Sequence, residues 1–277
     1  DLAVAVGALW GAAAELAADR WLVRGAGRVL LGLREAERPG WAPEASTADI
    51  GAWVVGSLRP EDAEVVLDLT GVTAHDSGAG LLAMAGGALA GRRLSGVVPP
   101  DERELPATGI GGGLARRAFA ARVDISELLA ADAVLAARAR ESGEGLDVAP
   151  GGGAAGGTGL AVLSLGGRLV SGTQFCHQAA GLDRTLRAAD LVVTACTELS
   201  ALDRGGPVVT AVAAWAEAAQ RPCLLVTSGA GLARRELRTL GIEAAHLLPA
   251  GPVTADGLTA VAARIAAGWY VGGGGLA

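Results

Sequence analysis

Three stretches of this chain follow one pattern, in which a short apolar run leads through a glycine-containing loop into a segment of helix-forming residues. The apolar runs are "AEVVLDLTG" at 63–71, "LVVTACTEL" at 191–199 and "PCLLVT" at 222–227. Such runs, bounded by turn residues, are typical of buried strands, and strands that alternate with helices form parallel sheets covered on both faces. The sequence therefore predicts an α/β fold. Ligands on such sheets bind outside the carboxyl ends of the strands, in this chain near 70–77, 194–200 and 227–231.

The chain is long enough for two domains, because it has 277 residues of which 51% are hydrophobic. The segment "ESGEGLDVAPGGG" at 141–153 is the most plausible linker. We therefore predict a first α/β domain at 1–145 and a second at 146–277, and we expect 91–113 to be mostly loop. Apolar residues at helical spacing predict helices at 7–23, 49–58 and, with interruptions, 114–141.

Charge and composition exclude several classes of partner. The net charge is −6 and no basic stripe is visible, which argues against nucleic acid. No uninterrupted apolar run reaches the roughly 18 residues of a membrane span, and the first residues do not resemble a signal peptide. The three cysteines are scattered, so we expect no disulfide framework and a cytoplasmic protein. All 23 basic residues are arginine, so any phosphate clamp must use arginine or backbone N–H groups.

Residues 149–159, "APGGGAAGGTG", hold six glycines in eleven positions. One interpretation is a loop whose N–H groups face an anion at the start of a helix. The other is close packing of backbone on backbone, which also requires glycine. The segment does not follow the lysine-containing phosphate-loop pattern, and the sequence alone leaves both interpretations open.

Asp76 follows a predicted strand directly, next to His75. It could bind Mg²⁺ or accept a proton from a substrate hydroxyl, as bases do in phosphoryl transfer, and His75 could be a second acid–base group. The alternative for Asp76 is a helix cap, where aspartate is favoured. Further along, Glu198 and Asp203, with Thr194 and Thr197, could form a metal site of oxygen ligands, or could simply face solvent.

The order of these motifs resembles that of the bacterial type II glycerate kinases. The segment "APGGGAAGGTGLAVLSLGGRLVSG" resembles their glycine-rich segment, and "VVLDLTGVTAHDSGAG" is similar to their strand and loop "G-G-S-A-T-x-D-G-G-x-G". Asp76 matches the aspartate of the family. The matching glycines are Gly78, Gly80, Gly151, Gly153, Gly156, Gly157 and Gly159.

This resemblance implies a kinase that phosphorylates glycerate with ATP and Mg²⁺. It also implies two α/β domains with parallel sheets, one of them flavodoxin- or Rossmann-like, and an active site in the cleft between them. On this basis the catalytic candidates are Asp76 and His75, with Asp76 also the candidate Mg²⁺ ligand. A homodimer is one possible assembly. The candidates for substrate or phosphate binding are the seven matching glycines, Thr194 and Glu198.

The chain departs from the family at positions that carry charge. Where the family has G-E-G-R, this chain has Ala195 to Glu198, so that an acid replaces the arginine, and Ser200 replaces a following aspartate. A D-x-F-K-G motif is absent, and a Q-K-G-A loop is rewritten near 120–125. Loss of one cationic contact in phosphoryl transfer can cost about 10³ in rate or more. Two functions therefore remain: a kinase of a small hydroxy acid with eroded motifs, or a non-catalytic protein that binds a small ligand or a protein.

Overall fold

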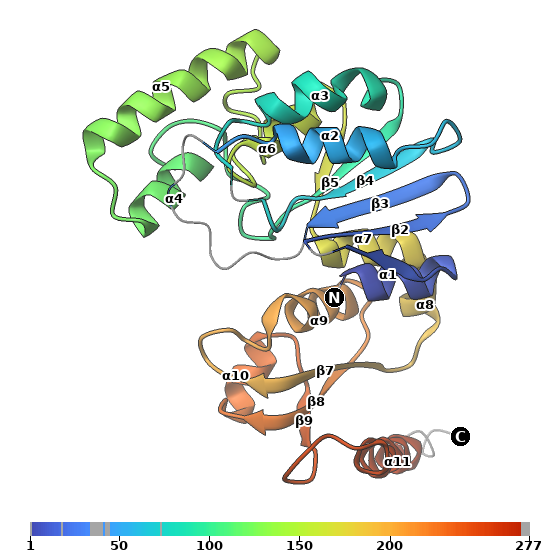
Figure 1. The fold of residues 1–277 in the computed structure, drawn as a ribbon. Coiled ribbons are helices and arrows are strands. Elements are labelled where there is room, and N and C mark those ends of the chain that lie inside the picture. Colours follow the sequence, from blue (N-terminus) through green and yellow to red (C-terminus); the bar gives the residue numbers. More distant parts are fainter. Residues whose placement is uncertain (1, 18, 34–40, 42–44, 73, 273–277) are drawn as a thin grey trace. The chain divides into compact units, whose positions relative to one another are not determined.

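The computed structural model describes residues 2–17, 19–33, 41, 45–72 and 74–272. The chain divides into two compact units, Asp1–Ala179 and Ala180–Ala277. Each unit is built on a sheet with parallel strands and has helices on the faces of that sheet (Figure 1). The predicted α/β fold with parallel sheets is thereby confirmed. Among the described helices, none is long and apolar enough to cross a bilayer.

The first unit contains a six-stranded sheet in the order β1-β2-β3-β4-β5-β6. The first three strands pair antiparallel, and β3 to β6 pair in parallel. The strands are β1 (Ala14–Leu16), β2 (Arg20–Gly25), β3 (Arg28–Leu33), β4 (Glu64–Asp68), β5 (Arg93–Val97) and β6 (Arg168–Val170). The helices are α1 (Leu2–Trp10), α2 (Ala48–Ser57), α3 (Ala79–Leu89), α4 (Gly113–Ala120), α5 (Ile125–Ser142), α6 (Thr158–Ser164) and α7 (Gly172–Ala180).

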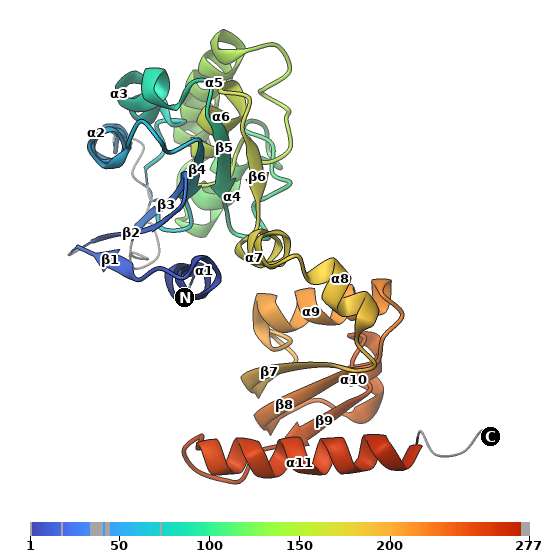
Figure 2. The same cartoon turned by 90° about the vertical axis from the view of Figure 1, so that its right-hand side faces the viewer.

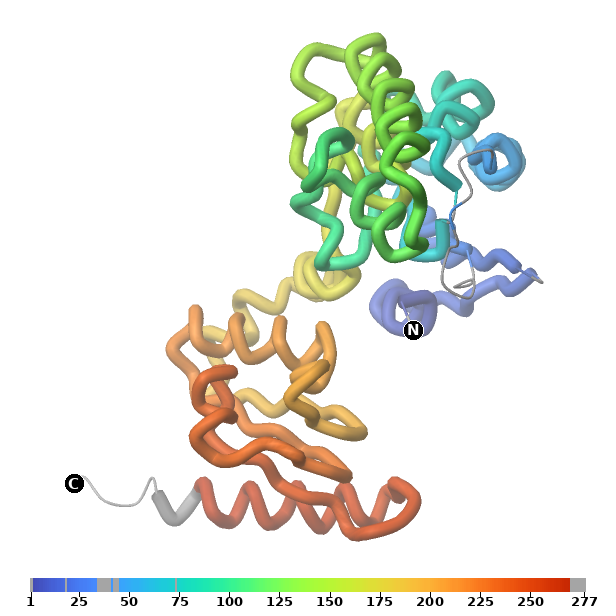
Figure 3. The backbone as a smooth tube through the Cα atoms, turned by 90° about the vertical axis from the view of Figure 1, so that its left-hand side faces the viewer, coloured from blue at the N-terminus to red at the C-terminus, as the bar shows by residue number. Residues whose placement is uncertain are grey.

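Side chains of the parallel strands alternate between two cores, as the pleat requires. Val65 and Leu67 of β4 pack against α2, α3 and α6, whereas Val66 belongs to a second core with residues of α1 and α7. Figure 1 shows these two sets of helices on opposite faces of the sheet. A third core joins α4 and α5 to Leu160 of α6; α4 and α5 lie side by side in Figure 3.

The second unit contains a three-stranded parallel sheet in the order β7-β8-β9. Residues of α9 and α10 form the core on one face, and residues of α11 cover the other face (Figure 2). The strands are β7 (Val192–Leu199), β8 (Cys223–Ala230) and β9 (Ala244–Leu247). The helices are α8 (Leu182–Ala188), α9 (Gly206–Ala218), α10 (Arg234–Thr239) and α11 (Ala255–Gly272).

The helix predicted at 7–23 is wrong beyond Trp10. Gly11 adopts a φ of 64° and follows the end of α1. In β2, buried Trp21 and Val23 alternate with partly exposed neighbours and pair with β3. This alternation with a period of two indicates a strand. The helical spacing of the apolar residues that precede it led to the prediction of one continuous helix. The expected loop at 91–113 likewise contains β5, which is buried between β4 and β6.

The division between the two units also differs from the boundary predicted near residue 145. Residues 168–170 form β6, which pairs in parallel with β5 of the first sheet. The glycine-rich segment and α6, which precede β6, contribute to the cores of the first unit. Residues 146–179 therefore lie in the first unit. The second unit begins just before α8, which leads to β7.

Candidate functional site

Asp76 lies in the loop between β4 and α3, and its carboxylate connects the starts of two helices. It accepts hydrogen bonds from the N–H of Thr47 (2.7 Å) and the hydroxyls of Thr47 (2.9 Å) and Ser46 (3.0 Å), just before α2. It also accepts from the N–H groups of Gly78 (3.0 Å) and Gly80 (3.1 Å), at the start of α3. The side chain is buried, with 9% of its surface exposed. A carboxylate has about four lone-pair positions, so these five donors engage it fully.

Helix capping accounts for only part of these contacts. The N–H of Gly80 lies in the first turn of α3, where N–H groups have no partner inside the helix. The donors of Ser46 and Thr47 lie just before α2, so the carboxylate also ties the start of α2 to the start of α3. Its neighbour His75 is also buried, and its ring lies 5.4 Å from the ring of Trp41. In the described part of the chain, no group of three or more His, Cys, Asp or Glu side chains could hold a metal ion.

Residues 151–159 of the glycine-rich segment are buried, and their backbone donors point at the protein itself. Seven of the nine N–H groups in 151–159 donate to acceptors of the first unit. One of these acceptors is the carboxylate of Glu102, at 2.8 Å from the N of Ala155; the others are backbone carbonyls. An anion site needs N–H groups that are free to face the ligand. The donors are the N–H groups of Gly152, Gly153, Ala154, Ala155, Gly157, Thr158 and Gly159.

The glycines of this segment allow backbone to approach backbone. A Cβ on Gly153 would lie 2.1 Å from the carbonyl oxygen of Pro106, and a Cβ on Gly156 would lie 1.9 Å from that of Ala74. Gly156 also has a φ of 66°, which favours glycine. Gly80 shows the same relation outside the segment, because its Cβ would lie 2.3 Å from the N of Ala48. These positions therefore need glycine because other backbone atoms of the chain pack against them.

Two arginines hold the loops around Asp76 in place. Arg117 of α4 donates to the carbonyl of Val72 (3.4 Å) and pairs with Glu102 (3.6 Å). Burial lowers the pKa of Arg117, and the charge of Glu102 offsets part of that effect. Arg138 of α5 donates to the carbonyl of Asp76 (3.1 Å). Both guanidinium groups are thus engaged by the first unit.

Thr194 and Glu198 lie four residues apart on β7, in the second unit. Thr194 is 6% exposed, whereas Glu198 is exposed beside Gly229 of β8. The strand runs from Val192 to Leu199, in agreement with the apolar run at 191–199. Downstream, Asp203 closes its own turn, and the N–H of Gly205 and the hydroxyl of Ser200 lower its pKa. The predicted site residues are therefore divided between the two units, with Asp76, His75 and the glycines in the first.

A polar group that the sequence analysis missed lies at the carboxyl end of β6, where α7 begins. The hydroxyls of Ser171 and Thr173 are 3.0 Å apart, and Ser171 accepts from the N–H of Gln174. Arg103, from the loop after β5, donates to the side chain of Gln174 (2.9 Å). The sequence could have predicted this helix start, because Ser171-x-x-Gln174 has the spacing of a capping box.

The sequence profile described as the glycerate kinase family matches residues 117–267, which is more than half of the chain. The chain belongs to the glycerate kinase family. Two uncharacterized proteins, of Mycobacterium bovis and Mycobacterium tuberculosis, are each 32% identical to it over 216 residues, 75% of this chain. Those residues are 56% of each relative, so the chain spans about half the length of the curated relatives it matches.

A crystal structure of a Salmonella typhimurium LT2 protein assigned as glycerate kinase 2 has a similar fold. The TM-score is 0.73, and the match covers 98% of this chain and 86% of that chain at 17% identity. The family assignment that the sequence motifs predicted is confirmed. The glycerate kinase motifs that this chain keeps, at Asp76 and in 151–159, are those whose atoms pack against their own chain.

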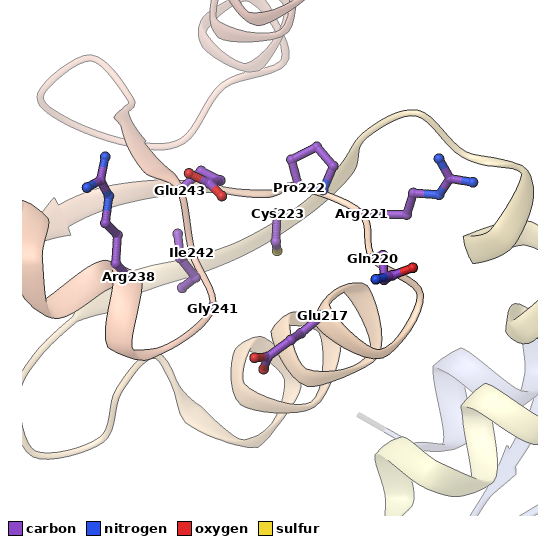
Figure 4. Close-up of a pocket in the computed structure, with 9 residues that line it drawn as sticks. All are labelled: Glu217, Gln220, Arg221, Pro222, Cys223, Arg238, Gly241, Ile242 and Glu243. Atoms are coloured by element: carbon purple, nitrogen blue, oxygen red, sulfur yellow. The ribbon is translucent and has the colours of Figure 1, made fainter.

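A cavity beside the second sheet lies away from the edge where ligands bind on such folds. It measures about 660 Å³ and is polar, with Glu217, Arg221, Arg238 and Glu243 among its lining residues (Figure 4). Pro222 and Glu243 directly precede β8 and β9, so the cavity is at the amino-terminal ends of the strands. Cys223, also in its wall, is fully buried, and burial raises the pKa of its thiol to about 11. A neutral buried thiol is a poor nucleophile.

Proposed function

We propose that this protein descends from ATP-dependent kinases of glycerate, binds a small hydroxy acid, and has lost most of the capacity for phosphoryl transfer. Membership of the glycerate kinase family supports the ancestry and the substrate class. The observation that carries the loss is Glu198, an exposed acid at the carboxyl end of β7 where the family pattern has an arginine. An acid at this position repels the charge that gathers on a transferring phosphoryl group instead of stabilising it.

No lysine can replace the missing cation, and two arginines of the first unit are engaged within that unit. The chain has no lysine. Arg117 and Arg138 are engaged by Glu102 and by backbone carbonyls of the first unit. For Mg²⁺, Asp76 does not fit as a ligand, because five protein donors already surround its carboxylate. ATP and its Mg²⁺ remain the expected co-substrate of the ancestral reaction.

In this proposal the hydroxy acid binds at the start of α7. The first N–H groups of a helix attract a carboxylate, and the hydroxyls of Ser171 and Thr173 lie beside them. Arg103 adds a cationic side chain next to Gln174. This group stands at the carboxyl ends of β5 and β6, the edge at which parallel sheets bind ligands. A cytoplasmic location and a homodimer stay predictions.

A second candidate is a non-catalytic protein that binds a small ligand or a protein partner. The use of Asp76 and of the glycine-rich segment for internal packing favours it, because neither feature then indicates retained catalysis. The two candidates differ in turnover, and the second also allows a protein partner in place of the hydroxy acid.

The test is thermal unfolding of the protein with Mg-ATP and with D-glycerate, followed by measurement of ADP release. A ligand at 100 times its Kd adds about 2.7 kcal/mol of stability, so we expect D-glycerate to raise the Tm. We expect ADP release at least about 10³-fold below the roughly 1–100 s⁻¹ of active kinases. Turnover in that active range would contradict the loss of activity. A Tm shift without ADP release would favour the second candidate, and no shift with either ligand would exclude the first.

A further inference from the structure

A second cavity, of about 240 Å³, lies in the first unit on the face of the sheet that α1 and α7 cover. Its strand residues are the first residues of β3, β4 and β6, so it opens at the amino-terminal ends of the parallel strands. This is the edge opposite to Ser171 and the proposed hydroxy-acid position. The lining residues are Trp10, Arg28, Glu64, Arg168, Phe175, Gln178 and Ala179.

The surroundings of this cavity carry an excess of positive charge. Arg28 of β3, Glu64 of β4 and Arg93 of β5 are neighbours across the sheet. Arg168 of β6 lies opposite Ser95 of β5. The single carboxylate, Glu64, pairs with Arg93 (3.2 Å). Among the described residues, neither Arg28 nor Arg168 forms an ion pair. Three guanidinium groups and one carboxylate give a net charge of about +2 at this end of the sheet.

The wall of the cavity also contains two buried donors without acceptors. Both Nε1 of Trp10 and Nε of Arg28 are buried and make no hydrogen bond in the described structure. The guanidinium of Arg28 stacks on the ring of Trp10 at 4.5 Å, which fixes the two groups relative to each other. Buried N–H groups in proteins nearly always have an acceptor. The two N–H donors and the guanidinium groups of Arg28 and Arg168 are the groups that bind an oxygen-rich anion.

We propose that this cavity binds a phosphoryl group as a dianion, supplied by inorganic phosphate or by a small phosphate ester. A dianion matches the net charge, and guanidinium groups bind phosphate oxygens with two donors each. Sites for drug-sized ligands have volumes of about 300–1,000 Å³, so a cavity of 240 Å³ suits a small anion and excludes a nucleotide. The proposal is independent of the proposed function, because no residue of the cavity belongs to the hydroxy-acid position.

The experiment is isothermal titration calorimetry of the full chain with inorganic phosphate and, separately, with glycerol 3-phosphate. Ionic strength is held constant with NaCl, so that nonspecific screening does not change during the titration. We expect saturable binding, at least tenfold weaker in Arg28→Gln and in Arg168→Gln. The control is Arg235→Gln, which removes the same charge from an exposed position on α10 and should bind as the wild type does. Trp10→Phe should abolish any change in tryptophan fluorescence that accompanies binding.

Three results would overturn the proposal: no saturable heat with either probe, equal binding of both probes by Arg168→Gln and wild type, or an equal loss of binding in Arg235→Gln. Because Arg168 is exposed, its substitution leaves the fold intact and decides the matter even if Arg28→Gln does not fold. Binding elsewhere, for example at the start of α7, would survive in both cavity variants and would count against the cavity. Tighter binding of one probe identifies whether free phosphate or an ester is the better ligand.

Discussion

Gly156→Ala is expected to lower the free energy of unfolding of the first unit by about 4 kcal/mol or more. The new Cβ would lie 1.9 Å from the carbonyl oxygen of Ala74, and the backbone φ of 66° is unfavourable for alanine. A left-handed conformation costs about 1–2 kcal/mol outside glycine, and overpacking a rigid site costs about 1–3 kcal/mol or more. The nearest atoms belong to the backbone of Ala74, a buried residue, so they cannot move aside as the end of a flexible side chain would. Urea unfolding followed by circular dichroism measures the change.

The matched control is Gly87→Ala, in the exposed part of α3. No atom lies within 4 Å of the Cβ it would add, and its φ is helical. Alanine is favoured over glycine inside a helix by roughly 0.5–1 kcal/mol, so this variant should be slightly more stable than the wild type. If Gly156→Ala unfolds like the wild type, the segment is not packed against Ala74, and the interpretation of a ligand-facing loop regains support.

Asp76→Asn is expected to destabilise the protein by about 2–3 kcal/mol. The amide keeps one acceptor oxygen and places an NH₂ group against donors such as the N–H of Thr47 and Gly80. Hydrogen bonds to a charged group contribute roughly 1.5–3 kcal/mol, and a buried group left without its partner costs a similar amount. Both α2 and α3 lose their shared acceptor, so the change should also speed amide exchange in the first turns of these helices.

Asp49→Asn is the control for Asp76→Asn. Asp49 is exposed in the first turn of α2, so its substitution removes the same charge near the same helix end without breaking a buried network. A charge in that position contributes only about 0.3–1 kcal/mol. If Asp76→Asn kept wild-type stability but lost any remaining ADP release, the carboxylate would act in catalysis and would not be the structural cap inferred from its five hydrogen bonds.

The fold was predictable where strand, loop and helix follow in short order. The segments from 63 to 90 and from 222 to 241 contain the strands and helices expected of them. The prediction failed where a strand forms only by pairing with segments that are distant in the sequence. β5 and β6 are short and lie in loop-like sequence, and only pairing with β4 and with each other makes them strands. Such tertiary contacts override local preference.

The candidate site was predictable as a set of positions and much less as a set of roles. Motif spacing identified Asp76 and the glycines, and it correctly indicated the glycerate kinase family. It could not show that the glycine-rich segment donates to Leu105 and Glu102, because those acceptors are about fifty residues away in sequence. Both interpretations require glycine for the same reason, the absence of a Cβ. Only the direction of the N–H groups distinguishes them.

Hydrogen exchange of the backbone amides in 151–159 tests most directly whether this segment packs against its own chain. We predict slow exchange for the seven donors, including Gly157 and Thr158, because they are buried and bonded within the chain. We predict the same rates with and without Mg-ATP. Fast exchange in the free protein that slows when Mg-ATP is added would mean that these N–H groups face the nucleotide, and it would contradict the internal packing of the segment.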